Sequence, residues 1–251
     1  MQFAHTGPQR NRRRSNTRPP ARAQHAPARA RHAQHAPHAP LAYRAARAAL
    51  ERPLRAAYDV DVEGLDNVPK GQGVILAANH RSFMDSMFLA IASPDPVAFV
   101  AKAEYFENPL TRWLFRATGQ IPLRRGSPAG ARQALAAAGE VLTAGGTLGI
   151  YPEGTRSRDG KLHRGKLGPA RLAAATGAAI VPVGLVGTDK VQLPEERLPH
   201  LFRPVAVRFG TPRRLPYRDG RASTRRLRQT TDELMHDIAE LSGAEYVDSF
   251  A

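Results

Sequence analysis

Short apolar runs alternate with stretches of helical periodicity along most of this chain. The apolar runs are bounded by Gly, Pro or polar residues, as buried strands are, and they cover residues 73–78, 96–101, 147–151, 179–185 and 202–209. Apolar residues at helical spacing follow in residues 86–91, 128–144, 169–176 and 224–241. This alternation predicts an α/β fold, with a mostly parallel central sheet flanked by helices.

The pattern also divides the chain. We expect a disordered tail rich in Arg, Ala, Pro and His at residues 1–40, a helical segment at 41–58, a single α/β domain at 59–215 and a C-terminal helical segment at 216–251. Large apolar residues are nearly absent from the tail, so it cannot bury enough surface to offset the entropy cost of ordering. Its Arg-rich, acid-free composition is also similar to an organellar transit peptide, although its many prolines argue against an amphipathic helix there.

The segment at 41–58 reads as a helix that Pro53 breaks. Its mixture of arginines and aliphatic residues suits either an anionic membrane surface or packing against the domain, and the sequence leaves both open. The chain contains no run of eighteen apolar residues, so no transmembrane span is predicted, and any membrane contact is expected to be peripheral.

Charge points to anionic partners. The formal net charge is +15, of which eight arginines lie in residues 1–40. Such a charge suits nucleic acid, an anionic lipid surface or phosphorylated substrates. Nucleic acid is the less favoured of these partners, because aromatic residues make up only 6% of the chain. Without cysteine, the chain has no disulfide and no thiolate nucleophile, and the scattered histidines of the tail do not predict a metal site.

The first candidate site follows the apolar run 73–78. His80 is expected on a strand-to-helix turn, and Asp85 five residues later in the first turn of a helix that starts near Ser82. A carboxylate there can fix the tautomer of the imidazole, whose other nitrogen then removes a proton from a hydroxyl. The alternative is structural: Ser82 and Asp85 would form only a capping box, with His80 a polar loop residue.

The second candidate site follows the run 147–151. Its turn contains Glu153, Gly154, Thr155 and Arg156. The guanidinium of an arginine matches a phosphate group, and backbone N–H groups beside a glycine can add to it. Glu153 either accepts a hydrogen bond from the substrate or pairs with an arginine to stiffen the loop. A base at one strand end and a phosphate clamp at another predict a phosphate ester that carries a hydroxyl as the substrate.

Four blocks of the sequence resemble, in order, those of the glycerolipid acyltransferase family, the family of 1-acylglycerol-3-phosphate acyltransferases. The blocks are residues 79–85, 119–125, 151–157 and 180–184, and the resemblance covers about residues 55–215. It implies that a fatty acyl group passes from acyl-coenzyme A or acyl carrier protein to the hydroxyl of a lysophosphatidic acid-type glycerophosphate acceptor in phospholipid biosynthesis. The carrier is then a co-substrate, no further cofactor is implied, and His80 and Asp85 are the catalytic pair.

The resemblance adds two basic residues for substrate phosphate. Lys102, at a strand end, matches a basic position of the family pattern. In the second block the family has an acidic residue before its arginine, whereas Arg124 and Arg125 are adjacent here; the spacing from Gly119 favours Arg125. The enzyme is expected at the cytoplasmic side of the membrane as a peripheral protein.

Residues 108–118 are expected to form one helix. Leu110, Trp113, Leu114 and Ala117 lie at helical spacing and favour core packing over an apolar wall for an acyl chain or bilayer. Other functions remain as alternatives: a basic nucleic-acid-binding protein, or a family member that acts on a different lysolipid. A serine hydrolase is disfavoured, because the sequence lacks a Gly-x-Ser-x-Gly elbow.

Overall fold

A computed structural model describes Met1 and residues 41–124, 126–196, 198–215 and 222–251. The predicted tail at 1–40 therefore lies, apart from Met1, outside the described residues. Arg125 also lies outside them, as do residues 216–221 at the start of the predicted C-terminal segment.

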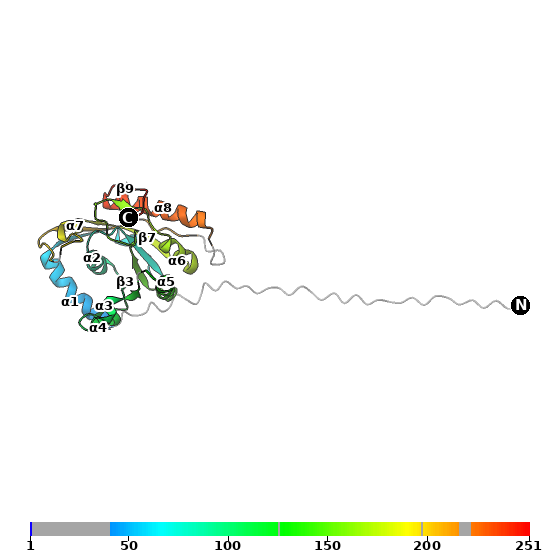
Figure 1. The fold of residues 1–251 in the computed structure, drawn as a ribbon, viewed down its shortest axis with the longest axis horizontal. Coiled ribbons are helices and arrows are strands. Elements are labelled where there is room, and N and C mark those ends of the chain that lie inside the picture. The colour runs from blue at the N-terminus through cyan, green and yellow to red at the C-terminus, as the bar shows by residue number, and fades with distance from the viewer. Residues whose placement is uncertain (2–40, 125, 197, 216–221) are drawn as a thin grey trace. The chain divides into compact units, whose positions relative to one another are not determined.

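Seven strands of the described residues form one sheet in the order β1-β8-β7-β2-β5-β3-β4 (Figure 1). Neighbouring strands run parallel throughout, except that β7 and β8 are antiparallel. The predicted α/β fold with a mostly parallel central sheet is confirmed. The strands are β1 (Asp59–Glu63), β2 (Val74–Ala78), β3 (Val97–Lys102), β4 (Ile121–Leu123), β5 (Thr147–Ile150), β7 (Ala179–Val186) and β8 (Pro204–Phe209).

Helices cover both faces of the sheet (Figure 1). On one face lie α1 (Leu41–Ala57) and α2 (Asp85–Ala92), and on the other lie α5 (Pro128–Thr143), α6 (Gly168–Thr176) and α8 (Thr224–Ser242). The remaining elements are short: a 3₁₀ turn (Leu65–Asn67), α3 (Glu104–Glu107), α4 (Arg112–Ala117), α7 (Thr188–Val191), and a small parallel pair of β6 (Leu162–His163) with β9 (Tyr246–Val247).

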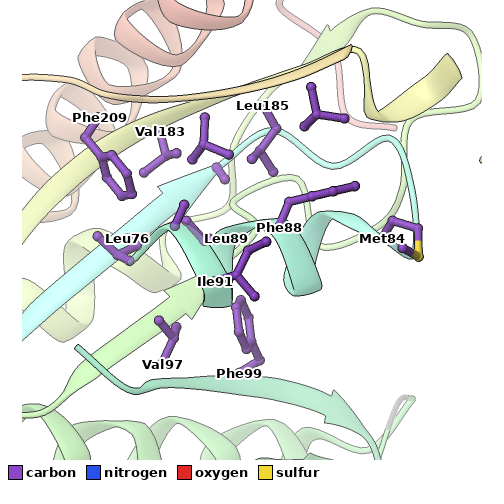
Figure 2. Close-up of a cluster of buried hydrophobic side chains, with 14 of the residues drawn as sticks. Leu76, Met84, Phe88, Leu89, Ile91, Val97, Phe99, Val183, Leu185 and Phe209 are labelled. Carbon is purple, nitrogen blue, oxygen red and sulfur yellow. The ribbon is translucent and has the colours of Figure 1, made fainter. Parts of the chain in front are cut away.

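Burial on both faces explains why β2 reads as one continuous apolar run. Val74, Leu76 and Ala78 belong to the core under α1 and α2, whereas Ile75 and Ala77 belong to the core under α5, α6 and α8. Figure 2 shows the first core, in which Leu76 lies among the side chains of α2 and β7. The carboxyl ends of β2 and β5 are neighbours in this sheet, so the loops that follow them meet.

A proline within the apolar run 179–185, Pro182, favours an edge strand or a bulge, because it has no N–H to donate to a neighbouring strand. The edge alternative is wrong, because β7 lies between β2 and β8. The bulge alternative is confirmed: Val183 pairs with Phe209 but Ile180 pairs with Arg213, so the partner chain contains one extra residue between the two pairs. Pro182 lies inside this irregularity and accepts a hydrogen bond from Gly210 N through its carbonyl oxygen, at 2.8 Å.

Two helical predictions are also corrected. Pro53 does not break α1, which continues to Ala57, because Leu54 is buried and Leu50 packs against the same core on the other side of the proline. Residues 108–118 do not form one helix: α3 ends at Glu107, and α4 begins only at Arg112, after Pro109.

The prediction of core packing for the apolar residues around α4 fails at two positions. Leu110 and Trp113 keep 82% and 64% of their surface exposed, and only Leu114 and Ala117 are half-buried. Leu110 lies before α4, and within α4 Trp113 remains exposed, because this short helix does not align all four positions with a core.

Candidate active site

Two turns meet at the carboxyl edge of the sheet. Residues 79–85, called here the base turn, join β2 to α2; residues 151–157, called the anion turn, follow β5. The base turn is fixed at its start by Asn79, whose side-chain amide donates to Leu185 O at 2.9 Å and accepts from Leu185 N at 2.7 Å. This pair of bonds holds the end of β2 against β7.

His80 and Asp85 lie together. His80 Nδ1 is 2.8 Å from Asp85 Oδ2, and the aspartate is fully buried while 18% of the imidazole side chain remains exposed. No described residue hydrogen-bonds to His80 Nε2. An ionised carboxylate can only accept hydrogen bonds, so the proton of a neutral imidazole lies on Nδ1 and Nε2 carries the free lone pair.

The contacts of the structural alternative, a helix cap, are present as well, and they do not exclude the contact between Asp85 and His80. Asp85 Oδ2 accepts hydrogen bonds from Arg81 N at 2.7 Å and from Ser82 N at 2.8 Å, in addition to the imidazole. The helix begins at Asp85 itself, three residues later than expected near Ser82. Because two backbone donors fix the carboxylate, its orientation towards the imidazole does not depend on His80.

Tyr151 supports the other face of the imidazole. The two rings stack with centroids 3.8 Å apart and planes 9° apart, and the phenol hydroxyl lies 2.8 Å from Ser86 Oγ. Burial raises the pKa of Tyr151 well above its usual value, and the negative charge of Asp85 raises it further. The phenol therefore stays neutral and fixes the ring plane of His80. This role of Tyr151 does not follow from the sequence, because an aromatic residue at a strand end is also typical of core packing.

Glu153 connects the two turns. Its carboxylate accepts from His80 N at 3.3 Å through Oε1 and from His163 N at 3.0 Å through Oε2, and the residue is 3% exposed. Burial raises the pKa of Glu153 to about 7, against the two backbone hydrogen bonds, which lower it. No arginine of the described residues pairs with it, so the predicted bracing of the loop acts through backbone N–H groups.

The anion turn presents basic groups to solvent. Gly154 has a φ of +75°, which favours glycine, and a Cβ at this position would lie 2.7 Å from Lys166 Nζ. Arg156 is half-buried and has no ion-pair partner among the described residues; Thr155 lies between them. Ser157 N donates to His80 O at 2.7 Å, which holds the neighbour of Arg156 against the base turn.

Lys166 is a functional candidate that the sequence did not reveal. It follows Gly154 by twelve residues, and it returns to the anion turn because its backbone N donates to Pro152 O at 2.8 Å. Arg81 was also missed: it donates to Gly160 O at 2.7 Å and to Asp189 Oδ2 at 3.2 Å, and so ties the base turn to the loop beyond the anion turn. Neither contact follows a short sequence pattern.

The other predicted phosphate ligands follow β3 and β4. Lys102 ends β3, is exposed, and lies 3.7 Å from Glu104 Oε1 through its Nζ. Arg124 follows β4 and pairs with Glu107 at 3.6 Å. Arg125 is among the residues that the structure does not describe, so the choice between Arg124 and Arg125 stays a prediction.

Metal and membrane features are limited in the part of the chain that is described. It contains no group of three or more His, Cys, Asp or Glu side chains placed to hold a metal ion. No helix in residues 41–124, 126–196, 198–215 and 222–251 has the length and apolar character needed to cross a membrane.

The part of the chain that contains both turns matches known proteins. The acyltransferase family model matches residues 59–186, which contain both turns. The 1-acyl-sn-glycerol-3-phosphate acyltransferase LPAT1 of Arabidopsis thaliana chloroplasts is 35% identical over 135 residues, which are 53% of this chain and 38% of the relative. The 1-acyl-sn-glycerol-3-phosphate acyltransferase of Borreliella burgdorferi is 33% identical over 134 residues, which are 53% of this chain and 54% of the relative. The matched region thus spans about half or less of these curated relatives.

A solved structure extends the likeness beyond the matched segment. The crystal structure of the 1-acyl-sn-glycerophosphate (LPA) acyltransferase PlsC from Thermotoga maritima superposes with a TM-score of 0.64 at 30% identity. The superposition covers 79% of this chain and 79% of that one. It includes more of the chain than the family model does, so the likeness reaches elements outside residues 59–186.

Proposed function

Because this chain belongs to the acyltransferase family, we propose that it transfers a fatty acyl group from a thioester donor to the free hydroxyl of a 1-acylglycerol 3-phosphate. The observation that carries this proposal is the distance of 2.8 Å between His80 Nδ1 and Asp85 Oδ2, at a turn that the backbone of the anion turn touches. A base beside a phosphate site suits an acceptor that has both a hydroxyl and a phosphate.

The acceptor binds through its phosphate. Arg156 supplies a charged fork of N–H donors to it. Gly154, with a φ of +75°, has no Cβ and so leaves room for a phosphate to approach the backbone. Holding the phosphate directs the acceptor hydroxyl towards His80 Nε2, and positioning of this kind can contribute several kcal/mol to the lowering of the barrier.

The chemical step then uses the dyad. His80 Nε2 accepts the hydroxyl proton while the hydroxyl oxygen attacks the thioester carbonyl carbon. Asp85 stabilises the resulting imidazolium through Nδ1–H. When the carbon–sulfur bond breaks, the carrier leaves as a thiolate and takes the proton from Nε2, which returns the imidazole to its neutral form. The proton leaves on the thiol and the acyl group on the acceptor, so this step uses no further cofactor.

The acceptor also implies a location. A lysophospholipid lies in a membrane surface, so we propose that the protein acts as a peripheral enzyme at the cytoplasmic face of an anionic membrane, in phospholipid biosynthesis. Leu110 and Trp113 are exposed beside Arg112 and Arg116, a combination that suits the interface of an anionic bilayer. Vesicle binding that does not change in a Leu110→Ser, Trp113→Ser variant would contradict this contact.

The direct test is acyl transfer with labelled acyl-coenzyme A and lysophosphatidic acid, measured for the parent and for His80→Ala. We expect transfer by the parent and a fall in kcat of about 10³-fold in the variant, because the base is removed. His200→Ala is the matched control, since His200 also pairs with a carboxylate, Glu196 Oε1 at 3.0 Å, but on the exposed surface. Equal activity of parent and His80→Ala would contradict the proposal, and release of free fatty acid without an acceptor would point to a hydrolase.

A further inference from the structure

A basic depression lies beside the anion turn and is used by none of the steps above. It has a volume of about 400 Å³ and is lined by Arg164, Lys166, Leu167, Arg171, Arg228 and Phe250. We propose that this depression binds the phosphorylated adenosine end of an acyl-coenzyme A donor. This inference rests on the proposed function, because it assigns the site of the donor in that reaction.

Two of its cations are already neutralised and two are not. Arg164 Nε lies 3.3 Å from Asp248 Oδ1, and Arg228 Nη2 lies 2.5 Å from Asp232 Oδ1. Lys166 and Arg171 are exposed and have no acidic partner among the described residues. The depression therefore carries an excess of two positive charges that face solvent, as a ligand with several phosphate charges requires.

An aromatic surface accompanies these charges. The guanidinium of Arg164 lies over the ring of Phe250, with its central carbon 5.5 Å from the ring centroid, and Phe250 is 58% exposed. A flat base can stack on such a pair, as bases stack on aromatic and arginine planes in nucleotide-binding proteins. The combination of phosphate-binding cations and a stacking surface fits a nucleotide better than it fits free phosphate.

The depression is also connected to the reacting groups. Lys166 N donates to Pro152 O, and Lys166 Nζ lies beside Gly154 in the anion turn. Glu153 precedes Gly154 in the anion turn and accepts a hydrogen bond from His80 N at 3.3 Å. A donor held by its nucleotide here can extend its pantetheine arm along the anion turn towards His80.

A membrane lipid is the less favoured occupant of this depression. Arg171 lies on α6 and Arg228 on α8, which both cover the face of the sheet opposite α1. The exposed Leu110 precedes α4 and the exposed Trp113 lies on it, and α4 packs near α1 (Figure 1). The depression and the apolar residues that suit a bilayer are thus on different sides of the sheet, so the site favours a donor that arrives from solution.

The test uses the full chain and the double variant Lys166→Gln, Arg171→Gln. Both residues are exposed, so the fold should persist, and thermal unfolding checks this. Calorimetric titration with adenosine 3′,5′-bisphosphate should show binding to the parent and at least about tenfold weaker binding to the double variant. Lys70→Gln is the matched control: it removes one exposed charge just before β2, at the opposite edge of the sheet, and should bind like the parent.

Kinetics with two donors complete the test. The double variant should raise KM for acyl-coenzyme A by at least about tenfold. It should leave KM unchanged for acyl-pantetheine, which lacks the nucleotide, and for lysophosphatidic acid. Equal nucleotide binding by parent and variant, a raised KM for the acceptor in place of the donor, or equally strong binding of inorganic phosphate or anionic vesicles would overturn the inference.

The same assays separate this inference from the proposed function. Transfer from acyl-pantetheine by a parent that binds no nucleotide would retain the acyltransferase reaction and overturn the donor site. Transfer from acyl carrier protein alone would do the same. Nucleotide binding without transfer from any donor would overturn the proposed reaction and leave the pocket as a nucleotide site.

Discussion

The base turn and the anion turn stand at the ends of adjacent strands but are built in opposite ways. In the base turn Asp85 is fully buried, and one of its oxygens accepts three hydrogen bonds from within the turn. In the anion turn Gly154 is exposed and Arg156 is only half-buried. Neither Arg156 nor the neighbouring Lys166 has an acidic partner among the described residues. A base needs a fixed orientation, whereas an anion site needs unpaired positive charge that the substrate can reach.

The two turns are nevertheless joined by residues that belong to the anion turn. Tyr151 stacks on His80, and Glu153 accepts from His80 N. The division of roles predicts that changes in the base turn lower kcat, that changes in the exposed cations raise KM, and that changes in the joining residues alter stability as well.

The largest stability effect is expected for Glu153→Gln. Its pKa is raised from 4.5 to about 7 in the folded protein, so the folded state binds the proton more tightly than the unfolded chain. The stabilisation from this group is full below about pH 4.5 and is lost as the pH rises to about 7, a change on the order of 3 kcal/mol. Glutamine does not titrate, so the free energy of unfolding of the variant should lack this decline.

Urea denaturation between pH 4.5 and 7.5 measures that difference. Glu140→Gln, an exposed glutamate of α5, is the matched control and should retain the slope of the parent. If the free energy of unfolding of Glu153→Gln falls in parallel with that of the parent over this range, protonation of Glu153 does not stabilise the contact between the turns.

The next effect is a fall in kcat of about 10²-fold for Asp85→Asn. An asparagine oxygen in the place of Asp85 Oδ2 can still accept from Arg81 N, Ser82 N and His80 Nδ1, but it carries no negative charge. The imidazolium that forms when Nε2 takes the hydroxyl proton is then less stabilised. KM for the acceptor should stay within about twofold of the parent, because the phosphate site is untouched.

Thermal unfolding provides the control for Asp85→Asn, because the asparagine oxygen can accept the hydrogen bonds that Asp85 Oδ2 accepts and the variant should stay folded. Asp95→Asn, a half-buried aspartate after α2 that lies outside both turns, should leave kcat unchanged. A variant that keeps full kcat would assign Asp85 to capping alone.

The sequence predicted the parts of this site that local chemistry dictates. The buried runs of β2 and β5 and the polar residues after them placed His80, Asp85 and Arg156 at one edge of a sheet. Three contacts could not be predicted from the sequence: the stacking of Tyr151 on His80, the approach of Lys166 to the anion turn, and the hydrogen bonds that Glu153 accepts. Each depends on contacts between segments that share no local pattern. Leu110 and Trp113 show the same limit. Their helical spacing predicted one buried helix, but Leu110 lies before α4 and both side chains are exposed, because burial depends on what packs against each residue.

A smaller effect is expected for Arg156→Ala. We expect KM for lysophosphatidic acid to rise about tenfold with little change in kcat, because the lost contact is made in both the ground state and the transition state. Arg158→Ala is the matched control, since Arg158 is 84% exposed and lies 4.0 Å from Glu195 Oε1. Steady-state kinetics over a range of acceptor concentrations separate the two parameters, and a fall in kcat with unchanged KM would contradict the assignment.

The most direct measurement of the division between the turns is the preference for a phosphorylated acceptor. It is the ratio of kcat/KM for lysophosphatidic acid to kcat/KM for monoacylglycerol, which has the hydroxyl but lacks the phosphate. The account predicts that Arg156→Ala lowers this ratio by about tenfold, whereas His80→Ala lowers both rates and leaves the ratio unchanged. A ratio that falls in His80→Ala and is preserved in Arg156→Ala would contradict it.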